Sequence, residues 1–405
     1  MKEITFIHAA DLHLDSPMTG LSHLPKEIFE RLKESTFASL KKITNAAIQH
    51  QVDFVILAGD LFDEQDRSVR AQTRLRKEME RLEAHHIHVY VVHGNHDHLN
   101  GTWVHLDMPE NVHVFGGQAE VKTFTKPDII TRLYGFSYEK RHVTENRLHE
   151  YIKKDGADFH IGILHGHHES SSEHRSYAPF RLKELLEKNF DYWALGHIHK
   201  RMILHENPYI IYPGNIQGRN KKETGKKGCY LVSLNGSETK LEFIDTASIQ
   251  WEEMLLNGQE VNHFQDLYAL CQRAIEEKRV PRKGMLLSIT LQNLHLEEKE
   301  LTSVLNGDLL QALQEEEKEE DSFVWTMKLN VEQSFSWDRD QLERESDFYV
   351  ELFHTADHFE QITESISPLF EHPSAVKFLA PLSEKEKQDL QQQALHTLLG
   401  LLQKN

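Results

Sequence analysis

The sequence predicts an α/β protein, because apolar strand patterns alternate with amphipathic helix patterns along its first part. Short apolar runs at Ile4–Ala9, Phe54–Ala58 and 87–92 are typical of strands buried on both faces. Between them, Lys26–Gln49 and 68–84 carry apolar residues at helical spacing. Strands that alternate with helices in this way form parallel sheets with right-handed crossovers.

Length and composition narrow the class of protein. The chain has 405 residues, which is enough for two domains or more. It contains no apolar run of about 18 residues, and its first residues lack the regions of a signal peptide. We therefore expect a cytoplasmic protein without a membrane partner. Its only cysteines, Cys229 and Cys271, provide neither a disulfide framework nor a Cys-rich zinc site.

The charge is distributed unevenly along the chain. The formal net charge of -18 disfavours nucleic acid as a partner if it is taken as one number. Residues 1–250, however, hold 32 Lys and Arg against 34 Asp and Glu, whereas residues 251–405 hold 14 against 30. The acidic excess belongs to the C-terminal part, so contact between the near-neutral first part and DNA is not excluded.

Polar clusters follow five of the predicted strands at the point where each strand ends. The carboxyl ends of strands in an open α/β sheet line the crevice in which ligands bind. Histidine, aspartate and asparagine together offer the mixed nitrogen and oxygen ligands that suit divalent transition metals. The clusters are Asp11-Leu12-His13, Gly59-Asp60-Leu61-Phe62-Asp63, Gly94-Asn95-His96-Asp97, His165-Gly166-His167-His168 and Gly196-His197-Ile198-His199.

Some of these patterns have more than one interpretation. His167 and His168 compete with His165 as a ligand, although His165 directly follows the strand pattern at 161–164. After the last cluster, the loop between Asn215 and Cys229 is either a solvated charged loop or a contact for a phosphate backbone. Its cations, opposed only by Glu223, are Arg219, Lys221, Lys222, Lys226 and Lys227.

The remaining patterns divide the chain further. An antiparallel strand pair around Asn235-Gly236 would complete a first domain at residue 247. Residues 248–335 combine strand and helix patterns and predict a small α/β unit. Residues 336–405 predict two amphipathic helices, the second of which begins at a Ser383-x-x-Glu386 capping box. These helices either pack on their own domain or bind a partner through a helical groove.

Taken in order, the five clusters resemble the motifs of the calcineurin-like metallophosphoesterase family. The forms Asp-x-His-Leu, Gly-Asp-Leu-Phe-Asp and Gly-His-Ile-His-Lys are similar to its SbcD-like DNA-repair exonuclease branch and to YhaO-type bacterial members. Over residues 1–247 the resemblance rests on the motifs, and beyond residue 247 it rests on the order of the predicted elements alone. It implies a β-sandwich flanked by helices (αββα) over 1–247, an α/β capping domain over 248–335 and a helical partner-binding segment over 336–405.

The resemblance also implies a role for each site residue. His96 would protonate the leaving oxygen, and Asp63 would orient His96. Two divalent ions, which we expect to be Mn²⁺, would be held by two sets of ligands that share Asp60. The first set is Asp11, His13, Asp60 and His199. The second set is Asp60, Asn95, His165 and His197.

The function that the resemblance implies is hydrolysis of DNA phosphodiesters. It implies a 3'-to-5' exonuclease with single-strand endonuclease activity, which works with an SbcC-type ABC ATPase and forms a homodimer. The ligands alone do not select a substrate. A phosphodiesterase or phosphatase for nucleotides or small phosphoesters is therefore an alternative, and a non-catalytic scaffold for DNA ends is another.

Overall fold

A computed structural model of the chain describes residues 2–63, 68–101, 103–169, 177–236, 238–318, 320–332, 339–359, 361–371 and 382–402. Contacts between Cα atoms divide the chain into two units. The first unit comprises Met1–Leu256, Val261–Thr290 and Leu296–Asn330, and the second comprises Asn257–Glu260, Leu291–His295 and Val331–Asn405. No helix within the described ranges is long and apolar enough to cross a membrane. The three domains expected over 1–247, 248–335 and 336–405 stay a prediction.

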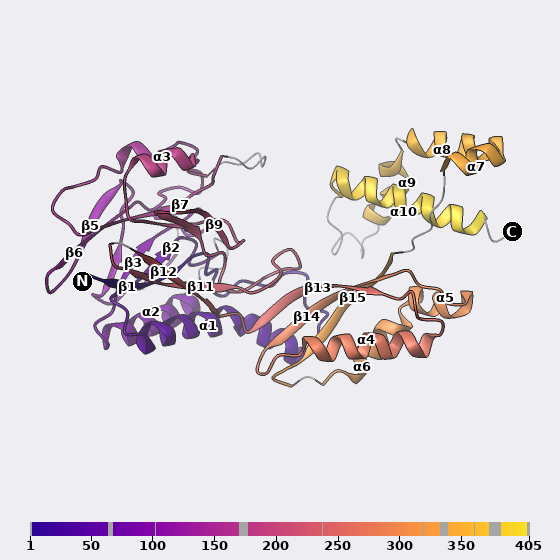
Figure 1. Cartoon of the computed structure of the whole chain (residues 1–405), viewed down its shortest axis with the longest axis horizontal. Helices are drawn as coiled ribbons and strands as arrows, with labels where there is room; N and C mark the ends of the chain where they lie inside the picture. Colours follow the sequence, from indigo (N-terminus) through magenta and orange to yellow (C-terminus); the bar gives the residue numbers. More distant parts are fainter. Residues whose placement is uncertain are drawn as a thin grey trace. The chain divides into compact units, whose positions relative to one another are not determined.

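A six-stranded sheet contains the parallel strands that the apolar runs predict. In spatial order its strands are β12 (Thr239–Asp245), β11 (Gly228–Leu234), β1 (Ile4–Ala9), β2 (Phe54–Ala58), β3 (His88–Val92) and β4 (Val112–Val114). β1 to β4 run parallel, whereas β11 pairs antiparallel with both β1 and β12. The crossover helices are α1 (Lys26–Gln49) and α2 (Val69–Glu83), and they lie together on one side of the sheet (Figure 1).

A second six-stranded sheet packs face to face on the first. Its strands, in spatial order, are β5 (Glu120–Lys126), β6 (Ile129–Gly135), β7 (Phe159–His165), β8 (Tyr192–Gly196), β10 (Tyr209–Tyr212) and β9 (Met202–Glu206). Phe6 and Ile56 of the first sheet share a buried cluster with Ile161 of the second. The short helices η1 (Leu148–Glu150) and α3 (Leu182–Glu187) contribute Leu148 and Leu185 to the core on its outer face. The predicted αββα sandwich is confirmed.

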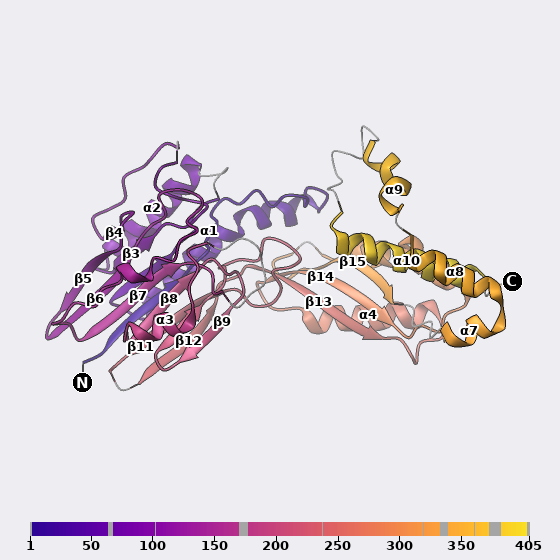
Figure 2. The same ribbon diagram turned by 90° about the horizontal axis from the view of Figure 1, so that it is seen from above.

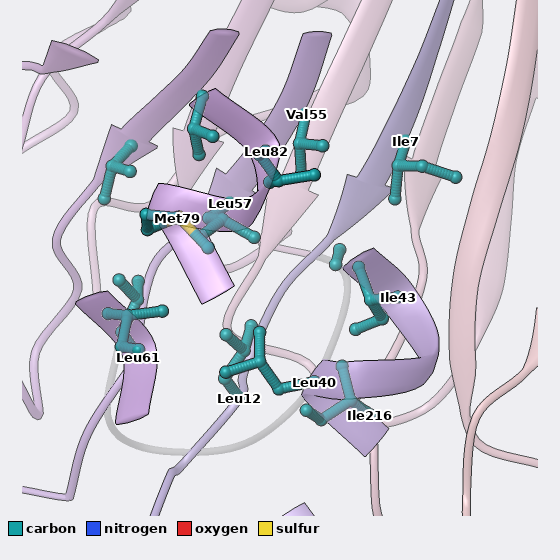
Figure 3. Close-up of a cluster of buried hydrophobic side chains, with 14 of the residues drawn as sticks. Ile7, Leu12, Leu40, Ile43, Val55, Leu57, Leu61, Met79, Leu82 and Ile216 are labelled. Carbon is teal, nitrogen blue, oxygen red and sulfur yellow. The ribbon is translucent and has the colours of Figure 1, made fainter. Parts of the chain in front are cut away.

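The core between the first sheet and its helices also anchors the turns that follow the strands. Leu12 and Leu61, which lie between polar residues after β1 and β2, are almost fully buried there. Burial of these leucines directs Asp11, His13 and Asp60 away from the core. Figure 3 shows how strands, helices and turns meet, with Ile7, Leu12, Leu40, Ile43, Val55, Leu57, Leu61, Met79, Leu82 and Ile216 labelled.

A third, three-stranded sheet belongs mainly to the first unit. Its strands are β13 (Ile249–Asn257), β14 (Gly284–Gln292) and β15 (Val324–Glu332), and its helices are α4 (Phe264–Lys278), α5 (Glu298–Asn306) and α6 (Asp308–Glu316). Figure 1 shows α4 and α6 on one face of this sheet. Trp251 and Leu286 share a buried cluster with Leu24 and Leu32, so the third sheet and α1 have a common core. Arg31 of α1 adds a hydrogen bond of 2.7 Å to the carbonyl of Asp321.

The second unit contains four described helices where the sequence predicts two. They are α7 (Arg339–Glu345), α8 (Asp347–Asp357), α9 (Ile362–Glu371) and α10 (Glu384–Leu402) (Figure 2). The apolar spacing continues from α8 into α9, so the pattern does not reveal the break between them. The predicted capping box of α10 is confirmed, because the Ser383 N–H donates to Glu386 Oε2 at 2.8 Å and the Glu386 N–H donates to Ser383 Oγ at 3.3 Å.

The burial of Leu12 generates a stability prediction. Leu12→Ala should leave a cavity beneath the turn after β1 and lower the free energy of unfolding by about 2–5 kcal/mol. Chemical unfolding followed by circular dichroism measures this change. Leu255→Ala is the matched control, because Leu255 is 60% exposed and its truncation should change the free energy by less than about 0.5 kcal/mol. Equal effects of the two substitutions would contradict the assigned role of Leu12.

Candidate metal centre

The turns after β1 and β2 lie side by side and present three polar side chains. The Asp11 N–H donates to the Gly59 carbonyl and the His13 N–H donates to the Asp60 carbonyl, both at 3.0 Å. Asp11, His13 and Asp60 have φ values of 52°, 42° and 51°. Left-handed backbone costs a residue other than glycine about 1 kcal/mol or more, and such strain is concentrated at functional sites.

Two glycines permit the close approach of these turns to β7. Gly59 has a φ of +93°, and a Cβ atom added there would lie 2.1 Å from His165 Nδ1. A Cβ atom at Gly94 would lie 2.3 Å from Asp60 Oδ1. Any larger residue at either position would displace His165 or Asp60. The glycines of the Gly-Asp and Gly-Asn-His motifs are therefore required by the space around these two side chains.

The first group of ligand-type side chains comprises Asp11, His13 and His199, whose candidate ligand atoms all lie within 4.8 Å of one another. His13 Nε2 lies 3.1 Å from His199 Nε2, and His199 Nε2 lies 4.0 Å from Asp11 Oδ1. Asp60 Oδ2 approaches His13 Nε2 to 3.9 Å. The four residues predicted to hold one metal therefore face a common point.

The second group comprises Asp60, His165 and His197. Asp60 Oδ2 lies 3.3 Å from His165 Nε2. Asn95 Oδ1 completes the group, because it lies 3.2 Å from His165 Nε2 and 3.1 Å from His197 Nδ1. The predicted second set is also brought together, and Asp60 faces both sets. The assignment of these residues as metal ligands stays a prediction.

Hydrogen bonds on the outer side of two imidazoles decide which nitrogen faces the first group. His13 Nδ1 lies 2.6 Å from Asp63 Oδ1, and His199 Nδ1 lies 2.7 Å from Glu223 Oε1. Both partners are acceptors when ionised, so each Nδ1 carries a hydrogen and each ring turns Nε2 toward the other. Two Nε2 atoms 3.1 Å apart need a proton or a metal ion between them, because their lone pairs would otherwise repel each other. The donor set therefore fits a divalent metal.

The second group has the same character. His165 Nδ1 donates to the Ala58 carbonyl at 2.9 Å, which leaves Nε2 facing the oxygens of Asp60 and Asn95. Burial is the largest single influence and would lower the pKa of His165, but the charge and hydrogen bond of Asp60, the charge of Asp11 and the hydrogen bond to Ala58 together raise this pKa to about 9. Burial and the charge of His165 lower the pKa of His197 to about 3, so His197 is neutral at pH 7 and able to bind a metal.

His96 and Asp63 lie at the edge of the centre. The His96 side chain is 32% exposed, and its Nδ1 lies 3.6 Å from Asp63 Oδ1. The shorter contact of Asp63 is to His13, and Arg219 Nη1 donates to both Asp63 oxygens at 3.0 Å. Burial would raise the pKa of Asp63, but His13 and Arg219 keep it well below its usual value. Asp63 is thus ionised beside two imidazoles, and its predicted role toward His96 stays a prediction.

The competing histidines lie apart from the two groups. His167 and His168 belong to none of the ligand groups found among the described residues. The His167 ring centroid is 6.0 Å from that of His197, and His168 forms a β-bridge with Phe180. The geometry therefore favours His165 as the ligand contributed by β7.

Several residues that support the site were not identified as such by the sequence patterns. The buried Asp97 accepts from the Leu61 N–H at 2.9 Å and from the Gly94 N–H at 2.7 Å, so it ties the turn after β2 to the turn after β3. Glu223 supports His199. Burial would raise the pKa of Glu223, but its hydrogen bond to His199 and the charge of that ring lower it to about 2. Its position as the only acid among five cations was the one available signal.

The basic loop serves two purposes. Arg219 is bound to Asp63, and Lys227 Nζ donates to the His199 carbonyl at 2.8 Å, so these two cations stabilise the site from within. The solvated-loop alternative therefore does not hold for Arg219 and Lys227, and the phosphate contact stays a prediction. Lys221, Lys222 and Lys226 are exposed. A cleft of about 860 Å³ opens beside His197 and His199, and Tyr177, Lys200 and Lys222 are also among its lining residues.

Comparison with known proteins identifies relatives of this chain. The family model described as calcineurin-like phosphoesterase matches residues 4–201. An uncharacterized metallophosphoesterase YhaO of Bacillus subtilis is 41% identical over 400 residues, which cover 97% of each chain. The DNA double-strand break repair protein Mre11 of Methanocaldococcus jannaschii is 27% identical and covers 62% of this chain and 68% of the relative. Mre11 of Thermoplasma acidophilum is 26% identical and covers 60% of this chain and 66% of the relative.

The raised pKa of His165 predicts proton release when a metal binds. Between pH 6.5 and about 9 the metal-free folded protein holds a proton on His165, and a metal at Nε2 displaces it. Metal affinity should therefore increase with pH until about 9. Calorimetry of Mn²⁺ binding at pH 7.5, in buffers of different ionisation enthalpy, should find about one proton fewer released by His165→Gln than by wild type. His168→Gln is the control, and equal release by all three proteins would contradict the prediction.

Proposed function

Because the chain belongs to the calcineurin-like metallophosphoesterase family, we propose that it is a metal-dependent DNA phosphodiesterase that acts as a 3'-to-5' exonuclease. Members of this family use a dinuclear metal site. The observation that carries the proposal is the approach of Asp60 to His13 of the first group and to His165 of the second. Beside them lies a cleft whose lining includes Lys200, Lys222 and Lys227. Two relatives named as DNA double-strand break repair proteins support DNA as the substrate.

The proposed metals are two Mn²⁺ ions held by the predicted ligands. When bound, two divalent ions neutralise the charge that develops on a phosphoryl group and orient its oxygens. His96 carries a partly exposed imidazole beside this centre, and the backbone N–H of His96 donates to Asp60 Oδ1 at 2.9 Å. This backbone hydrogen bond fixes the position of His96 and leaves its ring free to give a proton to the leaving sugar oxygen. Asp63, whose Oδ1 lies 3.6 Å from His96 Nδ1, would orient that ring.

The cleft offers the chemistry that a DNA strand requires. The exposed Lys200 and Lys222 suit the phosphates that flank the cleaved bond, since phosphate contacts depend on such cations. Tyr177 lies beside His197, with ring centroids 5.1 Å apart, and offers an aromatic face to a base. A strand bound in this way can also be cut internally, so we include single-strand endonuclease activity in the proposal.

The proposal extends to partners of the chain. Phe348, Leu369 and Leu398 of the C-terminal helices are 53%, 57% and 42% exposed. Apolar side chains that are exposed on amphipathic helices suit a helical partner, for which we propose an SbcC-type ABC ATPase. We also propose a homodimer. Co-purification with such an ATPase and sedimentation of the isolated protein test these two statements.

The central prediction concerns His96 and Asp60. With Mn²⁺, wild type should release nucleotides from the 3' end of labelled duplex and single-stranded DNA. His96→Ala should slow this release by about 10²–10⁴-fold, because the leaving oxygen loses its proton donor. Asp60→Ala should abolish release, because both ligand groups lose their common carboxylate. His205→Ala, on the partly exposed strand β9, is the control and should retain full activity.

The alternatives give different results in the same assay. If wild type leaves DNA intact and cleaves bis-p-nitrophenyl phosphate in an Asp60-dependent reaction, the protein acts on small phosphoesters. Release from the 5' end would overturn the polarity. Binding to DNA ends without cleavage of either substrate would favour a non-catalytic scaffold.

Substitution of the cleft lysines should weaken DNA binding without changing the hydrolysis of a small phosphodiester. The double variant Lys200→Glu and Lys222→Glu should raise the KM for DNA and lower the slope of log affinity against log salt by about 2, because two phosphate contacts are lost. Cleavage of bis-p-nitrophenyl phosphate should stay unchanged. Lys183→Glu on α3 is the matched control, because Lys183 is exposed and its side chain pairs with Glu187. An unchanged KM and salt slope in the double variant would exclude the cleft as the DNA-binding surface.

A further inference from the structure

We propose that Glu223 is a positioning residue that fixes the tautomer of His199 and thereby controls one of the two metal sites selectively. The inference rests on the metal centre of the proposed function and goes beyond it, because it assigns a role to a residue outside both predicted ligand sets. It also distinguishes the two metal sites, because different partners orient the histidines of each site.

Glu223 accepts hydrogen bonds at both carboxylate oxygens. Oε1 lies 2.7 Å from His199 Nδ1, and Oε2 accepts from Asn215 Nδ2 at 2.8 Å and from the Arg219 N–H at 2.7 Å. The side chain is only 10% exposed, so water contributes little to its solvation. Because Glu223 offers only acceptors, His199 Nδ1 must carry the ring hydrogen. The lone pair of Nε2 is then directed at the metal position.

An amide at residue 223 cannot reproduce this arrangement. With its oxygen toward His199, a glutamine would point its NH₂ group at the donors of Asn215 and Arg219. With the amide reversed, the NH₂ group would face His199 Nδ1, which would then have to accept. The ring hydrogen would move to Nε2, which would have to give it up before it could bind a metal. Either orientation leaves unfavourable contacts in a largely buried place.

The loop that carries Glu223 is held by the third sheet. Trp251 of β13 donates from Nε1 to the Gly218 carbonyl at 3.1 Å, and the Gly225 N–H donates to the Trp251 carbonyl at 2.9 Å. The same loop provides Arg219, which binds Asp63 beside His13. Both histidines of the first group therefore have an orienting carboxylate that residues of this loop support.

The second group does not depend on the loop. His165 is oriented by the Ala58 carbonyl of β2 at 2.9 Å, and His197 Nδ1 faces Asn95. Loss of the Glu223 carboxylate should therefore weaken the site formed by Asp11, His13 and His199 and leave the other site intact. A residue that merely stabilised the fold would not distinguish between the two sites.

The experiment is a Mn²⁺ titration of the full chain, followed by electron paramagnetic resonance and calorimetry. Wild type should bind two ions. Glu223→Gln and Glu223→Ala should bind one ion with unchanged affinity and the other about 10–100-fold more weakly, the usual effect of losing an orienting partner. Glu242→Gln on β12 is the matched control, because Glu242 is an exposed carboxylate, and it should behave like wild type.

A double-mutant cycle with His199→Ala tests whether Glu223 influences Mn²⁺ affinity through His199. Glu223→Gln should cause no further loss of Mn²⁺ affinity in the His199→Ala background, because the ring that it orients is absent. The inference is overturned if Glu223→Gln binds both ions as wild type does, weakens both equally, or adds a full further loss to His199→Ala. If wild type does not bind two ions, both the proposed metal centre and this inference are wrong. If wild type binds two ions but leaves DNA intact, only the nuclease proposal fails, and the ion affinities still decide the role of Glu223.

Discussion

The Asp60 carboxylate is buried between two imidazoles, with Oδ2 lying 3.9 Å from His13 Nε2 and 3.3 Å from His165 Nε2. A charge in such a place is costly unless cations or hydrogen bonds compensate for its lost hydration. The surrounding structure serves this requirement. Gly59 and Gly94 make room for the approach of Asp60 and His165, and a hydrogen bond from the backbone of His96 satisfies the second carboxylate oxygen. The strained turns and glycines of the motifs thus follow from one buried carboxylate.

Much of the fold, and the gathering of the candidate ligand side chains at one place, could be predicted, because the signals are local. The predicted helix over Lys26–Gln49 is present with those bounds, and polar residues directly after apolar runs mark the strand ends. The strands β5 and β9 were missed because each lies at an edge of its sheet, where partial exposure leaves a weak apolar pattern. Glu223 was not recognised as a support because its contact with His199 depends on the path of a loop through space. Local spacing carries no information about such a contact.

The third sheet supports both the candidate metal centre and the packing of α1. Its strand β13 holds the loop of Arg219 and Glu223, and its buried side chains share a cluster with α1. The orientation of His199 therefore depends on Glu223, 24 positions further along the sequence, and on Trp251, 52 positions further along. This dependence explains why a compact set of motifs alone does not describe the site. The supporting carboxylates and the sheet that anchors them belong to the same arrangement.

The left-handed backbone at Asp11 and Asp60 also shapes how this chain can change over evolutionary time. Asparagine tolerates that conformation nearly as well as aspartate, whereas β-branched residues do not. An Asp-to-Asn change therefore preserves the turn while it removes a negative charge, whereas a change to valine strains the turn as well. A single nucleotide substitution converts an aspartate codon into an asparagine codon. Descendants that lose one of these carboxylates but keep the turn are thus only one mutational step away.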